Sequence, residues 1–152
     1  MTSGLSPLPA LDDKSAILLI AHGSRRPAAN ADLVQIADWI TAAGHGGPIA
    51  CGYLELAEPD IPTAARSCLV PGIERLLMLP YFLSAGVHVT ADLEEIRQSL
   101  VTEFPGVEFV LCPHLGLHPL MLEIVKDRLR EGVAQMMSSP AISITTEAVT
   151  QP

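Results

Sequence analysis

Short apolar runs alternate along the chain with longer segments in which apolar residues recur every three or four positions. Such runs are typical of strands buried on both faces, and the longer spacing is typical of helices with one buried face. The runs predict strands at 16–21, 48–56, 75–82 and 107–113. The spacing predicts helices over about 30–43 and 62–69, a third helix after the third strand, and a fourth that starts at Pro119.

The third helix is identified from its apolar face, which is formed by Leu93, Ile96, Leu100 and Phe104. Three acidic residues lie near the start of this face: Asp92, Glu94 and Glu95. We expect them in the first helical turn, because the helix dipole favours anionic side chains there. His88 then lies at the helix entrance, just after the third strand.

Strand and helix alternate four times, which is typical of a parallel sheet with helices on both faces. Right-handed crossovers restrict how such strands connect. We therefore predict a three-layer α/β/α fold with a four-stranded parallel sheet in the order 2-1-3-4, a flavodoxin-like half-domain. In this order the strand sequence reverses between the first and third strands, and their carboxyl ends separate to leave a crevice for ligands.

The length of 152 residues suits one domain. Residues 1–14 are rich in Pro, Ser and Gly and are expected to form a flexible lead, followed by a single domain over 15–137. Residues 138–152 lack a helical period and are expected to form a mobile tail, although the stretch "AISITT" is also suited to an edge strand.

Composition and charge narrow the class of protein. No apolar run reaches the roughly 18 residues that a membrane span needs, and the first residues lack the pattern of a secretory signal, so we expect a cytoplasmic protein. The formal net charge of −8 argues against binding to nucleic acid. Cys51, Cys68 and Cys112 are far apart and form no CxxC pair, so we interpret them as buried thiols.

Three side chains with metal-binding chemistry are predicted at the crevice. His22 follows the first strand, His88 follows the third, and Glu55 leaves the second strand at the same edge of the sheet. Imidazoles and a carboxylate suit a divalent first-row metal, and two or three protein ligands leave positions open for exchange. The alternative for one histidine alone is a hydrogen-bonded residue at a strand end. The alternative for Glu55, as for Glu58, is a solvated turn residue.

Four segments carry a family resemblance: "LLIAHGSRRPAAN", "GYLELAEPDI", "LLMLPYFLSAGVHVTADL" and "LGLHPLM". Together they resemble the small class II chelatases, the sirohydrochlorin cobaltochelatases and ferrochelatases of the CbiX and SirB type, over roughly residues 16–130. The resemblance implies an enzyme that inserts Co²⁺ or Fe²⁺ into sirohydrochlorin during the biosynthesis of cobalamin or sirohaem. It implies His22 and His88 as catalytic metal ligands and Glu55 as a third catalytic residue.

The resemblance also implies that the divalent metal is a substrate and that no cofactor is bound permanently. Because this chain has the length of one half of the double-length relatives, it implies a homodimer with the tetrapyrrole between the subunits. The histidine-rich insertions of some nickel-handling relatives are absent, which favours cobalt or iron.

Residues near both histidines are predicted to bind the carboxylate-rich tetrapyrrole. Ser24 and Arg25 follow His22, and an arginine fork matches a carboxylate, although a solvated loop is the alternative for this arginine. Backbone N–H groups before the third helix are expected to form an anion nest, at Ser84, Ala85, Gly86 and Val87. Leu83 and Tyr53 suit contact with the flat ring and suit the core equally.

The other histidines are interpreted separately. His45 lies in a glycine turn and is expected at the surface, on the opposite edge from the crevice. His114 is expected to be exposed, and His118, just before Pro119, suits a structural role or a place on the crevice rim.

Two other functions stay open. A non-catalytic metal or tetrapyrrole carrier needs the same ligands and differs only in lacking turnover. The second is phosphoryl transfer with His22 as the nucleophile, because histidine phosphatases also place a histidine after a first strand. They carry an arginine directly before that histidine, where this chain has Ala21, which argues against this function.

Overall fold

The computed structural model describes residues 11–138, which belong to two units. The first unit ends at Gly116 and the second begins at Leu117. The described part of the first unit contains, in chain order, β1 (Ser15–Ala21), α1 (Pro27–Ala42), β2 (Ile49–Tyr53), α2 (Ile61–Cys68), β3 (Arg75–Pro80), α3 (Val87–Glu103) and β4 (Glu108–Leu111). The second unit contains α4 (Leu120–Ser138).

The four strands form one parallel sheet in the order β2-β1-β3-β4, which confirms the predicted fold and strand order. β1 lies between two neighbours, so that Leu18 is paired with Ala50 of β2 and with Met78 of β3. All of β1 except Ala21 is buried, as expected for a strand that is covered on both faces.

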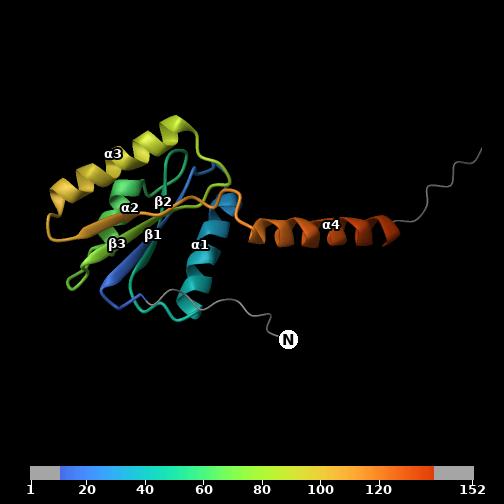
Figure 1. Cartoon of the computed structure of the whole chain (residues 1–152), viewed down its shortest axis with the longest axis horizontal. Coiled ribbons are helices and arrows are strands. Elements are labelled where there is room, and N and C mark those ends of the chain that lie inside the picture. The colour runs from blue at the N-terminus through green and yellow to red at the C-terminus, as the bar shows by residue number, and fades with distance from the viewer. Residues whose placement is uncertain (1–10, 139–152) are drawn as a thin grey trace, which may run out of the picture. The chain divides into compact units, whose positions relative to one another are not determined.

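Helices cover both faces of this sheet (Figure 1). On one face, Leu18 shares a core with Ala64 of α2 and Leu93 of α3. On the other face, Leu19 shares a second core with Leu33 of α1. Burial of each large aliphatic side chain contributes about 1.5–3 kcal/mol to stability. The two cores therefore fix the layer of strands whose ends carry the candidate site.

Two elements of the first half differ from their predicted bounds. α1 begins at Pro27, three residues before the predicted start, because the fixed backbone angle of proline suits the first helical position. β2 ends at Tyr53, and the chain then turns through Leu56, whose φ is 63°. The apolar residues after Tyr53 therefore belong to a loop and not to the strand.

α3 begins earlier than the pattern of charges predicts. Its first residue is Val87, preceded by Gly86 in an extended conformation. Its first turn contains no acidic residue, so the placement of Asp92, Glu94 and Glu95 in that turn was wrong. Glu94 instead accepts hydrogen bonds from Arg97 on the same helix, which lowers the pKa of its carboxyl group to about 2.

Backbone hydrogen bonds tie together the loops at the carboxyl ends of the strands. The N–H of Leu54 donates to the carbonyl of Ala21 (3.0 Å), and the N–H of Glu55 donates to the carbonyl of His22 (2.9 Å). Gly23 has a φ of 92°, and a Cβ at this position would lie 1.9 Å from the carbonyl oxygen of Glu55. The loop after β1 is therefore in close contact with the loop after β2.

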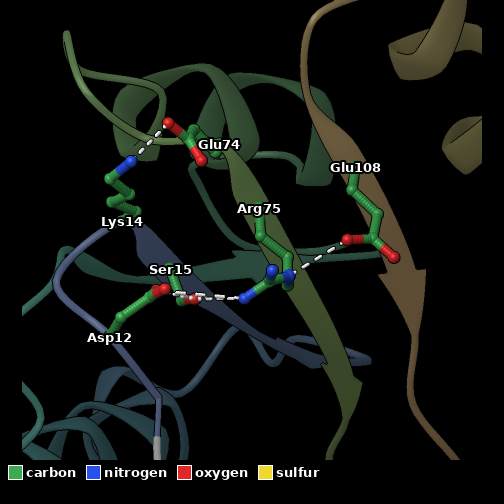
Figure 2. A network of polar contacts seen from close by, with 6 residues as sticks. All are labelled: Asp12, Lys14, Ser15, Glu74, Arg75 and Glu108. Atoms are coloured by element: carbon green, nitrogen blue, oxygen red, sulfur yellow. Dashed lines mark hydrogen bonds and ion pairs between the residues drawn. The ribbon is translucent and has the colours of Figure 1, made fainter.

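A polar network joins the amino ends of β1, β3 and β4, at the other end of the strands from these loops (Figure 2). The Ser15 hydroxyl donates to Asp12 (2.7 Å) and accepts from Nη1 of Arg75 (3.0 Å). Nε of Arg75 also donates to Glu108 of β4 (3.0 Å). The hydrogen bond from Ser15 is the main cause that lowers the pKa of Asp12 below its ordinary value.

α4, taken by itself, is an amphipathic helix without buried side chains. Its charged residues form ion pairs with each other, one of them between Glu123 and Lys126 (2.7 Å). Exposed apolar side chains recur at a spacing of three or four residues: Leu122, Val125, Leu129, Val133 and Met136. The helix therefore carries a continuous apolar stripe along one face.

The predicted domain boundaries are not tested by these elements. Part of the predicted flexible lead is described, and within it Leu11 is partly buried against the core that contains Leu33. The stretch "AISITT" lies outside the described residues. Among the helices of residues 11–138, none combines the length and the apolar character that crossing a membrane requires.

Replacing Ser15 by Ala removes two hydrogen bonds from a fully buried position, so we expect the free energy of unfolding at pH 7 to fall by about 1 kcal/mol. The lowered pKa of Asp12 stabilises the fold above the unfolded value of 3.8, and this contribution is lost as the pH falls through the folded value. The penalty of Ser15→Ala should therefore shrink in acid. Urea denaturation at several pH values measures both effects.

Ser67→Ala is the matched control, because the Ser67 hydroxyl is exposed and bonds only within its own helix, to the carbonyl of Ala64. An equal loss in the two variants, or a Ser15→Ala penalty that grows in acid, would contradict the role given to the network.

Replacing Gly23 by Ala should lower the free energy of unfolding by at least about 1–2 kcal/mol, since a Cβ is disfavoured in the left-handed region and would collide with the carbonyl of Glu55. Gly106→Ala is the control, because its Cβ would meet no atom within 4 Å and its φ is not positive. Thermal and urea denaturation of the two variants measure the difference. Equal stability would show that the close contact at Gly23 does not constrain the loop.

Candidate active site

A hollow of about 390 Å³ lies between the carboxyl ends of β1 and β3, where the strand order reverses. It is lined by residues 21–24 at the end of β1 and just after it, by residues 29–30 of α1 and by residues 81–84 after β3. The crevice therefore lies between the two strands for which it was predicted. A hollow of about 450 Å³ between α2 and α3 is larger, but no histidine lines it and its cation, Arg66, is paired with Glu103 (2.8 Å).

His22 is the first residue after β1 and lines this hollow. Its imidazole packs against the ring of Phe82, with ring centroids 4.5 Å apart and the planes tilted by 33°. Phe82 is only 4% exposed, whereas His22 is exposed. The imidazole therefore rests on a fixed, buried ring and stays accessible from the hollow.

The loop after His22 is closed by Asn30 of α1. The Ser24 N–H donates to Oδ1 of Asn30 (2.9 Å), and Nδ2 of Asn30 donates to the Ser24 carbonyl (2.8 Å). The N–H of Arg26 donates to the Ser24 hydroxyl (3.0 Å). The hydroxyl of Ser24, predicted to bind substrate, therefore has a local partner, while its peptide group is held by the helix.

Tyr53 belongs to the core beneath this loop. It is 5% exposed, and its hydroxyl donates to the backbone carbonyl of Asn30 (3.3 Å). Burial raises the pKa of this hydroxyl, which therefore stays protonated as a donor. Of the two interpretations that the sequence left open for Tyr53, contact with the ring or a place in the core, burial supports the second.

Glu55 and Glu58 occupy the loop after β2 in different ways. Glu55 is exposed, and its backbone N–H is the group that binds the carbonyl of His22. The carboxylate of Glu58 accepts from the N–H of Asp60 (3.2 Å), and Asp60 caps the start of α2. Glu58 therefore fits the interpretation as a turn residue, and Glu55 is the carboxylate whose backbone lies beside His22.

His88 is the second residue of α3 and is exposed. It follows β3, the neighbour of β1, so the two histidines leave adjacent parallel strands at the same edge of the sheet. His88 does not line the hollow that contains His22. Binding of one metal ion by both histidines therefore stays a prediction.

Residues 11–138 contain no group of three or more His, Cys, Asp or Glu side chains placed to hold a metal ion together. Thus His22, His88 and Glu55 do not form such a group, and the predicted two-histidine site is not tested by this finding. The three cysteines are free thiols, as predicted, but only Cys68 is buried, whereas Cys51 and Cys112 are half-buried. Burial raises the pKa of Cys68 to about 11 and also raises the pKa values of Cys51 and Cys112, which disfavours the thiolate that binds metals.

The segment between β3 and α3, together with Val87, the first residue of α3, presents a mixed apolar and polar surface. Leu83 and Val87 are 64% and 83% exposed, and Ser84 lines the hollow with Leu83. Ala85 is partly buried against the core, and Gly86 precedes the first turn of α3. The first N–H groups of a helix have no acceptor within it, so the start of α3 offers donors to an anion.

Arg25 is exposed. None of the ion pairs formed among the described residues includes it. Its guanidinium is therefore available to a carboxylate of a ligand.

The expectation that His45 lies at the surface was wrong. Its side chain is 6% exposed, and neither ring nitrogen has a hydrogen-bond partner in the described part of the chain. Gly47 allows this burial, because a Cβ there would lie 3.0 Å from Nε2 of His45 and 2.1 Å from the carbonyl oxygen of Ser15. The glycine turn therefore folds over the imidazole instead of exposing it.

The remaining two histidines agree with their interpretations. His114 is exposed, as expected. Nδ1 of His118 accepts from the N–H of Leu120 (3.2 Å), which gives it a structural role at the start of α4.

Two residues with roles at the hollow were missed by the sequence reasoning. Phe82 supports the imidazole of His22, and Asn30 holds the loop that follows it. In the sequence, Phe82 was interpreted only as the last residue of a predicted strand, and Asn30 only as the first residue of a predicted helix. The early start of α1 is what gives Asn30 its place, and the proline at 27 was a signal for that start.

The chain is similar to named proteins over most of its length. It is 30% identical over 126 residues to the chloroplastic sirohydrochlorin ferrochelatase of Arabidopsis thaliana, a match that covers 83% of this chain and 56% of the relative. It is 31% identical over 136 residues to the sirohydrochlorin cobaltochelatase of Methanothermobacter thermautotrophicus, which covers 79% of this chain and 94% of the relative. The chain thus spans just over half of the plant relative and nearly all of the archaeal one.

A solved structure has the same fold. It is the putative cobalamin biosynthesis CbiX protein of Marinobacter aquaeolei, with a TM-score of 0.68 and 27% identity over 80% of this chain and 98% of that one. The family model named CbiX matches residues 16–132. This match contains His22, Glu55 and His88, and it covers most of the chain. The chain belongs to the CbiX family.

Proposed function

We propose that this protein is a chelatase that inserts Co²⁺ or Fe²⁺ into sirohydrochlorin. The observation that carries the proposal is the family match over residues 16–132, which includes the strand ends that form the hollow. Relatives that match most of the chain are named sirohydrochlorin cobaltochelatase or ferrochelatase. In the reaction one M²⁺ enters the macrocycle, two pyrrole N–H protons leave it, and no electron is transferred.

His22 and His88 are the proposed metal-binding and proton-accepting groups. Imidazole suits both tasks, because a neutral ring nitrogen binds divalent first-row metals and also accepts protons near neutral pH. The buried ring of Phe82 restricts where the imidazole of His22 can lie. Glu55, whose backbone is bonded to that of His22, adds negative charge that attracts the cation or relays a proton. Few protein ligands leave coordination positions open for the ring nitrogens.

Local donors offset the repulsion between an acidic protein and an acidic substrate. The chain has a net charge of −8, and sirohydrochlorin carries many carboxylates. Arg25 and the first N–H groups of α3 lie on the segments that follow β1 and β3. Arginine binds carboxylates with two parallel hydrogen bonds, and a helix N-terminus favours anions. Exposed Leu83 and Val87 are the proposed apolar contacts of the macrocycle.

The protein is also proposed to work as a homodimer in the cytoplasm, although the Arabidopsis relative is named as chloroplastic. The proposal rests on the family resemblance, which implies that chains of this length pair as homodimers. The apolar stripe on α4, formed by Leu122, Val125, Leu129, Val133 and Met136, is a candidate contact between the copies. An exposed apolar stripe of this kind is typical of helices that pack against a partner.

His22→Ala and His88→Ala are each expected to lower the rate of metal insertion by about 100-fold or more, because each removes a ligand and proton acceptor. Glu55→Gln should give a partial loss, since it removes charge without removing a metal ligand. Insertion of Co²⁺ and of Fe²⁺ into sirohydrochlorin is followed by the spectral change of the macrocycle. His114→Ala is the control, since His114 is exposed and belongs to no predicted ligand set.

Near-normal rates in both histidine variants would remove the assignment of the metal ligands. Wild-type protein that binds sirohydrochlorin or Co²⁺ but does not accelerate the spectral change would identify a carrier and refute the chelatase.

The mass in solution should be about 32 kDa, twice the 16.2 kDa of the chain, when measured by light scattering. Leu129→Lys should shift this mass towards that of the monomer, because it places a charge in the middle of the apolar stripe. Gln135→Lys, which adds the same charge at an exposed polar position of α4, is the control. A monomeric mass for the wild-type protein would refute the dimer. If the Leu129→Lys variant dimerises with unchanged affinity, α4 does not form the contact.

A further inference from the structure

Asn30 connects α1 to the loop that carries His22. Its side chain reaches back six residues and binds both polar groups of the Ser24 backbone, with distances of 2.9 Å to the N–H and 2.8 Å to the carbonyl. We propose that Asn30 is a positioning residue, which holds the loop after β1 so that His22 keeps a single orientation over the hollow. This inference rests on the proposed function, because it concerns the imidazole assigned to metal insertion.

The two hydrogen bonds require a carboxamide. Oδ1 accepts and Nδ2 donates, so one side chain satisfies a donor and an acceptor that the turn leaves without strand or helix partners. Aspartate at this position keeps the acceptor and loses the donor, and alanine loses both. Asparagine is therefore suited to making both hydrogen bonds. Replacing it by aspartate or by alanine distinguishes the loss of one bond from the loss of both.

Asn30 is itself held at its backbone. Its carbonyl accepts from the hydroxyl of Tyr53, which is 5% exposed in the core of β2 and α1. In the same helix Leu33 is 2% exposed and packs into that core. Asn30 therefore stands on a helix that is packed against the core and not on a loop. Side chains on such rigid elements hold a site in place more precisely. Removing only the side chain of Asn30 leaves the bond from Tyr53 in place.

His22 is fixed from two sides by these contacts. Its carbonyl accepts from the N–H of Glu55 (2.9 Å), which holds the peptide unit before Gly23, and Asn30 holds the peptide units on both sides of Ser24. Gly23 lies between the two tethers in the left-handed region. Loss of the second tether frees the Gly23 hinge to rotate. A misplacement of about 1 Å in a catalytic group can cost about 100-fold in rate.

Asn30 also lines the hollow, so direct contact with substrate is the competing role. The two roles predict different kinetics. A positioning residue affects the chemical step, so its loss lowers kcat. A residue that binds ground state and transition state equally raises KM and leaves kcat unchanged.

The test compares Asn30→Ala and Asn30→Asp with Thr41→Val, which removes one side-chain hydrogen bond to a backbone carbonyl (3.1 Å) near the other end of α1. We expect Asn30→Ala to lower kcat by about 10- to 100-fold with little change in KM for sirohydrochlorin, and Asn30→Asp to lie between Asn30→Ala and wild type. Thr41→Val should behave as wild type. In Asn30→Ala, NMR should show faster amide exchange at Ser24 and a changed or broadened imidazole signal of His22.

Other results would overturn the inference. An increase in KM with unchanged kcat would assign Asn30 to substrate binding, and wild-type kinetics would remove it from the site. A loss of rate that only follows the unfolded fraction in thermal denaturation would leave it a purely structural residue. Wild-type protein without insertion activity would refute the proposed function alone. In that case the Ser24 exchange and the His22 signal still decide whether Asn30 holds the loop, and unchanged NMR data would refute it.

Discussion

The pairing of β1 with a parallel strand on each side is the constraint from which the rest follows. Because β1 is bonded to both β2 and β3, its carboxyl end cannot move without breaking contacts on either side. Backbone hydrogen bonds continue beyond the ends of β2 and β3: the N–H groups of Leu54 and Tyr81 donate to Ala21 and Ile20 of β1 (3.0 and 2.7 Å). The N–H of Glu55 donates to His22, just after β1. The loop after the central strand thus inherits the rigidity of a strand buried on both faces, although its side chains face a hollow.

This arrangement suits chemistry in which a metal ion passes through the site. The backbone around His22 is fixed by hydrogen bonds and by the buried ring of Phe82, while the imidazoles of His22 and His88 are exposed. A metal that is a substrate has to arrive, exchange its water ligands and leave with the product. If His22 is a ligand, as proposed, its ordered backbone keeps the cost of reorganisation low, and the open surface lets the ion leave.

The fold and the position of the hollow could be predicted because both depend on the order of apolar runs. The rule that ligands bind where the strand order reverses then led from His22 to the hollow. The first turn of α3 was misjudged because three acidic residues suggested a later start than Val87. His45 was misplaced because the turn folds over its imidazole only where Gly47 comes close to the carbonyl of Ser15, and that approach joins residues distant in sequence. Asn30 was missed for a different reason, since its contact with Ser24 depends on α1 beginning at Pro27.

The network of Asp12, Ser15, Arg75 and Glu108 lies at the far end of the strands from the hollow. The hydrogen bonds that join the amino ends of the strands are therefore far from the residues proposed to bind the ligand at the carboxyl ends. Because distant substitutions usually act independently, thermal stability can be altered at the amino ends of the strands with little effect on the proposed site at their carboxyl ends. Under the proposed function, stability and the rate of metal insertion therefore depend largely on different residues.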